Sequence, residues 1–116
     1  MDGGYVQVTT AVPSEAAAGL LARHAVEARL AAAVQVVGPV RSTYWWRGEI
    51  HDAAEWLCVA KTTGSRLHEL AALIAREHPY EVPEITAVRI SHGSSSYLTW
   101  VGQEASESGT ATERGR

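Results

Sequence analysis

The segment from His78 to Glu84 concentrates the residue types that could do chemistry in this sequence. It combines an imidazole, the phenol of Tyr80 and the carboxylates of Glu81 and Glu84 with two prolines. Each proline fixes its own φ and disfavours the helical region for the residue before it, so this stretch should be stiff and extended. Imidazole and carboxylate groups suit borderline and hard divalent ions. The sequence therefore predicts His78, Glu81 and Glu84 as a candidate metal site.

The same segment also has a purely structural interpretation. His78 would then make a hydrogen bond that holds a corner of the chain, and Glu84 would pair with an arginine such as Arg41 or Arg47. In an extended segment alternate side chains share a face, so Glu81 and Glu84 point apart unless a turn intervenes. One chain alone need not supply all three ligands, and a neighbouring subunit could complete the site.

Other candidate groups are few. Lys61 is the only lysine, and with Tyr80 it could contact a small anion in a cleft between subunits, although a salt bridge is the simpler role for it. Cys58 lies within an apolar run and is typical of a small buried hydrophobe. The sequence has no nucleophile elbow, phosphate loop or zinc-protease helix, so we expect no enzyme and no catalytic residues.

Composition predicts a small single domain. The chain has 116 residues, 46% of them hydrophobic, and a net charge of −3 with scattered arginines, which excludes a general attraction to nucleic acid. No apolar run approaches the roughly 20 residues that cross a bilayer, and no secretory signal is visible, so we expect a cytoplasmic protein without a membrane partner. The domain should span 1–103, and the polar composition of 104–116 predicts a disordered tail.

Hydrophobic periodicity predicts a β-α-β-β-α-β order. The expected elements are strands over 5–10, 33–47, 55–63 and 84–90, helices over 14–30 and 66–77, and a final helical turn or edge strand over 97–101. This order is that of a ferredoxin-like α+β sandwich, with both helices on one face of an antiparallel sheet. Gly38 and Pro39 should bend the long second strand.

That second strand, called the arm below, is longer than a domain of this size can cover. Fifteen residues at roughly 3.3 Å each extend about 50 Å. The arm ends in Tyr44, Trp45 and Trp46, and adjacent tryptophans on a strand point to opposite faces, so one would meet water on a monomer. Since aromatic residues are enriched at interfaces, these three are the predicted subunit interface of a homo-oligomer. The alternative is that the arm folds back as a hairpin and covers itself.

Several separated motifs give the sequence a family resemblance. They are Leu30–Val34, Arg41–Gly48, Lys61–Thr63, His78–Glu84 and Tyr97–Trp100. In this order they resemble the CutA family of divalent-cation tolerance proteins, over about 5–103. The resemblance implies a ferredoxin-like subunit in a homotrimer with the architecture of the PII signalling proteins. It also implies a link to tolerance of copper and other divalent metals.

The resemblance implies two functions for this chain. The first is a homotrimeric divalent-cation tolerance protein that binds Cu²⁺ or another divalent ion weakly, without needing the metal to fold. The alternative is a trimeric PII-like scaffold or sensor that binds a small ligand or a partner protein, so far unidentified, in the cleft between subunits. Family members often have cysteine where this chain has Ala33, and some where it has Thr9. Without these soft ligands, a site here must use imidazole and carboxylate.

Overall fold

The computed structural model describes residues 3–107. These residues form, in chain order, β1 (Tyr5–Val12), α1 (Glu15–Glu27), β2 (Ala33–Trp46), β3 (Glu49–Thr63), the 3₁₀ turn η1 (Gly64–Arg66), α2 (Leu67–Glu77), β4 (Thr86–Arg89) and α3 (Ser95–Glu104).

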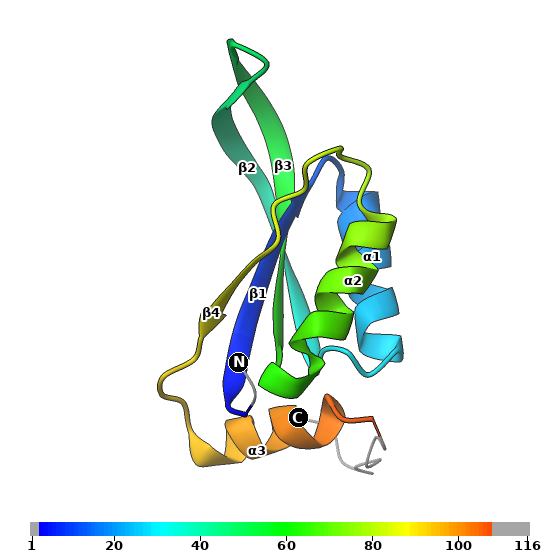
Figure 1. Cartoon of the computed structure of the whole chain (residues 1–116), viewed down its shortest axis with the longest axis vertical. Coiled ribbons are helices and arrows are strands. Elements are labelled where there is room, and N and C mark those ends of the chain that lie inside the picture. The colour runs from blue at the N-terminus through cyan, green and yellow to red at the C-terminus, as the bar shows by residue number, and fades with distance from the viewer. Residues whose placement is uncertain (1–2, 108–116) are drawn as a thin grey trace.

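The strands form an antiparallel sheet in the order β2-β3-β1-β4, and α1 and α2 lie side by side on one face of it (Figure 1). This arrangement confirms the predicted ferredoxin-like α+β fold. The β2–β3 hairpin projects beyond the helices at one end, and α3 crosses the opposite end.

The main core lies between the sheet and the two helices. Val6 and Val8 of β1 and Leu70 of α2 are each 1% exposed. Ala18 of α1 is fully buried, and its small side chain lets the helix approach the sheet closely. Cys58 also lies in this core, where burial raises the pKa of its thiol. That environment fits the small hydrophobic role predicted for it.

Both main helices differ slightly from the expected bounds. Ser14 is the N-cap of α1, since its hydroxyl accepts a hydrogen bond from the Ala17 amide at 3.0 Å. The helix ends at Glu27, before the predicted residue 30, and Arg29 turns the chain with a φ of 61°. The start of α2 is preceded by the turn η1, which the periodicity did not indicate.

The arm is paired along its length with β3. The pairing runs from Ala33 opposite Lys61 to Trp46 opposite Glu49, with a register shift between Val37 and Val40 where the bend was expected. The turn between the strands uses Arg47 and Gly48, both at positive φ. The longest dimension of the molecule is 48 Å, which matches the long arm.

The prediction that the third strand begins at Glu55 was wrong. β3 begins at Glu49, because residues 49–54 pair with the end of β2 and need no buried face to form a strand. His51 lies in β3 and stacks on Tyr44 with ring centroids 5.7 Å apart. The arm therefore folds back on β3 as a hairpin, as the alternative interpretation proposed, but it does not cover its own aromatic end, because Trp45 is 71% exposed.

The C-terminal segment is helical. The segment 97–101, predicted as a helical turn or an edge strand, lies within the helix α3. Val101 and Ala105 pack with Ala32 in a second small hydrophobic cluster. β4 is shorter than the predicted 84–90. Most of the predicted tail, 108–116, lies outside the described residues, so its disorder stays a prediction.

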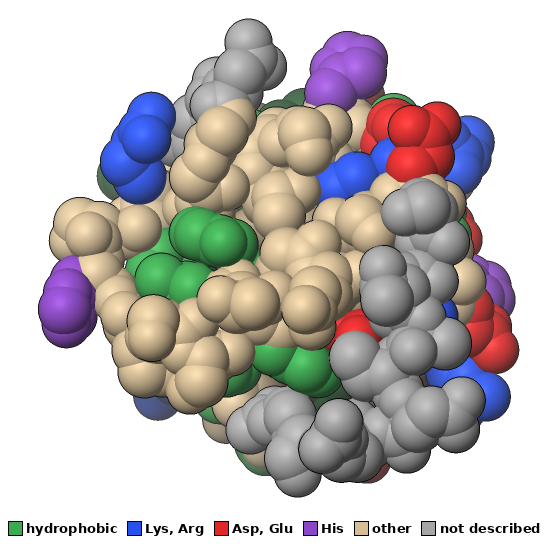
Figure 2. Space-filling view, turned by 90° about the horizontal axis from the view of Figure 1, so that it is seen from below, with side chains coloured by type: hydrophobic (Ala, Val, Ile, Leu, Met, Phe, Trp, Pro, Cys, Tyr) green, Lys and Arg blue, Asp and Glu red, His purple; other side chains and the backbone are tan. Residues whose placement is uncertain are grey.

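The end of the molecule that carries α3 shows small hydrophobic patches among backbone and polar side chains, with charged side chains toward the rim (Figure 2). Among residues 3–107, no helix combines the length and apolar character that crossing a bilayer requires.

Candidate functional site

The proline corner at 78–84 begins where the sequence places it. α2 ends at Glu77, and His78 is extended with φ −77° and ψ 132°, as expected for a residue before proline. Its side chain is only 9% exposed. Nε2 lies 2.8 Å from the Ala11 carbonyl oxygen, and Nδ1 lies 3.1 Å from the Tyr80 amide nitrogen. A carbonyl can only accept and an amide can only donate, so Nε2 carries the hydrogen and both ring nitrogens are engaged.

The two carboxylates of the predicted metal set lie in different surroundings. Glu81 accepts a hydrogen bond from Arg47 at 2.9 Å, in an ion pair that is largely exposed. Glu84 is exposed. The suggested pairing of Glu84 with an arginine is not what forms, because Arg47 bonds Glu81 and Arg41 lies 3.6 Å from Asp52.

Within residues 3–107, no group of three His, Cys, Asp or Glu side chains is arranged to hold a metal ion. A single subunit therefore does not assemble His78, Glu81 and Glu84 around one point. The predicted metal set stays a prediction, and it needs either a rearranged corner or a ligand from another subunit.

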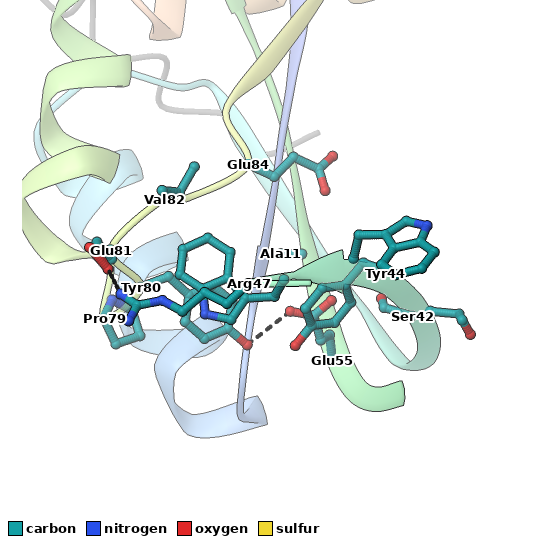
Figure 3. A pocket seen from close by; sticks show the side chains of 13 residues that line it. Ala11, Ser42, Tyr44, Arg47, Glu55, Pro79, Tyr80, Glu81, Val82 and Glu84 are labelled. Carbon is teal, nitrogen blue, oxygen red and sulfur yellow. Dashed lines mark hydrogen bonds and ion pairs between the residues drawn. The ribbon is translucent and has the colours of Figure 1, made fainter. Parts of the chain in front are cut away.

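A groove of about 800 Å³ lies between the arm and the proline corner (Figure 3). The arm contributes 42–47, the corner contributes 79–82 and Glu84, and Ala11 and Glu55 complete the lining. Figure 3 shows the Arg47 side chain reaching from the arm to Glu81, so this ion pair links the two walls. The groove exists because the hairpin projects past the helices while the corner turns back toward it.

Glu55 and Tyr80 form the most deeply placed polar contact of this groove. Glu55 is 7% exposed, and the Tyr80 hydroxyl donates to its Oε2 at 2.8 Å. Burial, together with the hydrogen bond to the Glu55 carboxylate and its charge, raises the pKa of Tyr80 to about 12. The phenol therefore remains a neutral donor near pH 7.

Sequence reasoning missed Glu55. The only signal was a carboxylate directly before the apolar run 56–60, and a strand end is an ordinary place for a charged residue. Its burial depends on Tyr80 and the corner folding over it, which only the tertiary structure brings about.

The aromatic end of the arm remains largely uncovered in the single chain. Trp45 is 71% exposed, Tyr44 41% and Trp46 37%. The guanidinium of Arg47 lies over the Trp46 ring, 5.3 Å from its centroid, which is a cation–π arrangement. The hairpin thus satisfies its backbone hydrogen bonds without covering these side chains.

Lys61 lies away from this groove. It is paired with Ala33 and Gln7 at the other end of β3, and its Nζ donates to the Gln35 side chain at 3.1 Å. One subunit does not bring Lys61 and Tyr80 to a common pocket. Their predicted meeting in a cleft between subunits stays a prediction.

Fold and groove together define a small ferredoxin-like α+β protein with a projecting β-hairpin arm. Comparison with known proteins identifies the family within this class. The chain belongs to the family described as CutA1 divalent ion tolerance protein, whose profile matches residues 6–104. The resemblance stated from the motifs is confirmed.

Individual relatives agree with this assignment. The divalent-cation tolerance protein CutA of Thermus thermophilus is 42% identical over 94 residues, covering 81% of this chain and 91% of that protein. Mouse protein CutA is 40% identical over 102 residues, covering 85% of this chain and 58% of the mouse protein. The crystal structure of CutA1 from Oryza sativa superposes with a TM-score of 0.87 at 34% identity, covering 91% of this chain and 96% of that one.

This chain therefore spans little more than half the length of the mouse relative. The family to which it belongs is described by its link to divalent ion tolerance. Relatives differ in compartment by name, since a rice relative is called chloroplastic and a CutA of Archaeoglobus fulgidus periplasmic.

Proposed function

We propose that this chain acts in the cytoplasm as a homotrimeric divalent-cation tolerance protein that binds copper or another divalent ion weakly. Membership of the CutA1 family is the observation that carries the tolerance function. The trimer, the metal and the compartment are the parts of the proposal that experiments must test.

The exposed arm supports assembly. Trp45 is 71% exposed at the end of an edge strand that projects from the domain. Burying one such side chain against a neighbour contributes on the order of 2 kcal/mol. An edge strand left open also invites pairing with another chain. A symmetric oligomer would cover both the aromatic end and the open edge of β2.

The corner supports weak rather than tight metal binding. Glu81 and Glu84 are accessible carboxylates, but Glu81 would have to leave Arg47, and His78 would have to release the Tyr80 amide to free Nδ1. Both rearrangements cost free energy and therefore lower the affinity for a metal ion. Oxygen ligands with one imidazole suit Cu²⁺ or Zn²⁺ better than Cu⁺.

Calorimetric titration of the tag-free protein with Cu²⁺ tests the metal site. The double variant Glu81→Gln with Glu84→Gln should bind at least about tenfold more weakly, because both charged ligands are lost. Glu15→Gln with Glu49→Gln removes two exposed carboxylates elsewhere and should bind as the wild type does. Equal copper affinity in the wild type and the Glu81, Glu84 variant would refute this site.

A second candidate function is a PII-like scaffold or sensor that binds a small ligand or partner in a cleft next to the arm. The groove of about 800 Å³ favours it, since that volume is typical of small-molecule sites. A thermal-shift screen of metabolites and nucleotides tests the idea. The absence of any shift across such a screen would count against it.

A further inference from the structure

A histidine and a glutamate meet where α1 and α2 lie side by side. Nδ1 of His24 lies 2.8 and 2.9 Å from the two carboxylate oxygens of Glu77. Of the ion pairs formed within residues 3–107, this is the one that uses an imidazole. The carboxylate presents both of its oxygens to the same ring nitrogen. Two residues therefore bring three donor atoms close to one point.

The spacing of these atoms fits a bound divalent ion as well as a hydrogen bond. In proteins zinc lies about 2.0–2.1 Å from an imidazole nitrogen and about 2.0–2.2 Å from a carboxylate oxygen. Two bonds of that length at a right angle place the nitrogen and the oxygen about 2.9 Å apart, and His24 and Glu77 already have this separation. The hydrogen that Nδ1 donates would pass to Nε2, because imidazole binds a metal through an unprotonated nitrogen.

Both residues lie on helices whose positions the core fixes. Ala25, directly after His24, is 3% exposed, and so is Ile74, one turn before Glu77. His78, directly after Glu77, is held at both ring nitrogens by backbone partners. Ligands on packed helices need less ordering when an ion binds than ligands on a loop do. The pair is therefore positioned before any ion arrives.

The pair lies apart from the surface that the proposed trimer would cover. α1 and α2 lie on the helical face of the sheet, whereas the arm projects beyond them (Figure 1). The side chains of His24 and Glu77 are 41% and 28% exposed. The neighbouring Arg23 bonds Glu27 at 2.9 Å, so its guanidinium is engaged elsewhere. An ion from solvent can reach the pair without passing the arm.

We propose that His24 and Glu77 form a second binding site for a borderline divalent ion, Zn²⁺ or Cu²⁺, between the two helices. Imidazole nitrogen and carboxylate oxygen suit these ions. Water would complete the coordination, because within residues 3–107 no third His, Cys, Asp or Glu side chain joins this pair. With two protein residues as ligands the site is weak, so it fills only when the ion is abundant. It goes beyond the proposed function and shares no residue with the proline corner.

Paramagnetic Cu²⁺ identifies the histidine that binds it. NMR spectra of the imidazole groups would be recorded on the full chain in its native assembly, during addition of substoichiometric Cu²⁺. The ion broadens the signals of groups close to it, so the His24 signals should broaden before those of His68, an exposed histidine on α2. Equal broadening of His24 and His68 would overturn the proposal.

Calorimetric titration with Zn²⁺ tests the carboxylate. It uses the Glu81→Gln, Glu84→Gln protein as background, in which both carboxylates of the proline corner are already removed. Adding Glu77→Gln keeps the shape of an exposed side chain, so the protein should fold, and Zn²⁺ should bind at least about tenfold more weakly. Adding Glu27→Gln, an exposed carboxylate on α1, is the matched control and should leave binding unchanged. A background that binds no Zn²⁺, or equal affinity after Glu77→Gln, would overturn the site.

The two metal sites fail separately. Broadening of His24 that persists in the Glu81→Gln, Glu84→Gln variant supports the site between the helices, whatever happens to copper affinity at the corner. Broadening of His24 that disappears in that variant would assign the ion to the proline corner and overturn the second site.

Discussion

At the scale of single residues, His78 has a structural role. Its two ring nitrogens join β1, through the Ala11 carbonyl, to the corner, through the Tyr80 amide. The ring also lies against Tyr80, with centroids 4.9 Å apart. The histidine that was predicted as a metal ligand therefore holds two parts of the chain together through hydrogen bonds.

His78→Ala should lower the free energy of unfolding by about 1–3 kcal/mol, because it leaves a buried carbonyl without its donor. Urea denaturation measures the difference. His68→Ala, at an exposed position on α2, should change stability by less than about 0.5 kcal/mol. Equal stability of the two variants would contradict the structural role of His78.

The Tyr80 phenol should lose its proton at a higher pH than an ordinary tyrosine does. Its folded pKa of about 12 lies above the reference value of 10, so the folded state keeps its proton where the unfolded state loses it. The stabilising contribution is therefore complete below pH 10 and is lost as the pH rises from 10 to 12.

Comparison of the wild type with Tyr80→Phe isolates this effect. Absorbance titration should show one late tyrosinate transition in the wild type that is absent in the variant, and the wild type should lose more stability above pH 10. Identical stability profiles in this alkaline range would contradict the Glu55–Tyr80 contact.

At the scale of elements, the arm is shaped by its bend as well as its length. A Cβ at Gly38 would collide with Cδ1 of Trp56, so the absence of a side chain lets β2 pass close to the indole. Gly19 in α1 has no neighbour within 4 Å of such an atom. The same substitution should therefore act in opposite directions at the two positions.

Gly38→Ala should destabilise the protein by about 1–3 kcal/mol through overpacking against Trp56. Gly19→Ala should stabilise it by about 0.5–1 kcal/mol, since alanine is the better helix former. Thermal unfolding of both variants measures the pair. A stable Gly38→Ala protein would show that the indole can move away without cost.

At the scale of the whole molecule, the arm is the part whose large apolar side chains stay exposed in a single chain. The core between sheet and helices is closed, whereas the end of the hairpin exposes Tyr44, Trp45 and Ile50. Exposed apolar side chains of this size favour association with another chain. The proposed trimer assigns that surface to a neighbouring subunit.

Light scattering at micromolar concentration should give three times the 12.5 kDa mass of the chain. Trp45→Ser should weaken the assembly, so that smaller species appear on dilution, because it removes the most exposed large aromatic side chain of the arm. Leu20→Ser, at a 57% exposed position on α1, is the control and should leave the mass unchanged. A monomeric wild type would refute the interface.

The amino-acid sequence by itself determined the order of elements, the corner and the family. Hydrophobic periodicity and proline restrictions are local, so they placed α2, the extended His78 and the bent arm. The first half of β3 escaped prediction, because residues 49–54 form a strand through pairing with β2 and not through a periodic pattern of their own.

The candidate site was decided only by the tertiary structure. Glu55 and Tyr80 are 25 residues apart, and their contact exists because β3 and the corner meet behind the arm. In the folded chain both ring nitrogens of His78 make hydrogen bonds to backbone atoms, and Glu81 forms an ion pair with Arg47. Residue types in a sequence show which chemistry is available, whereas burial and partners, which depend on packing of distant segments, decide which groups remain free to use it.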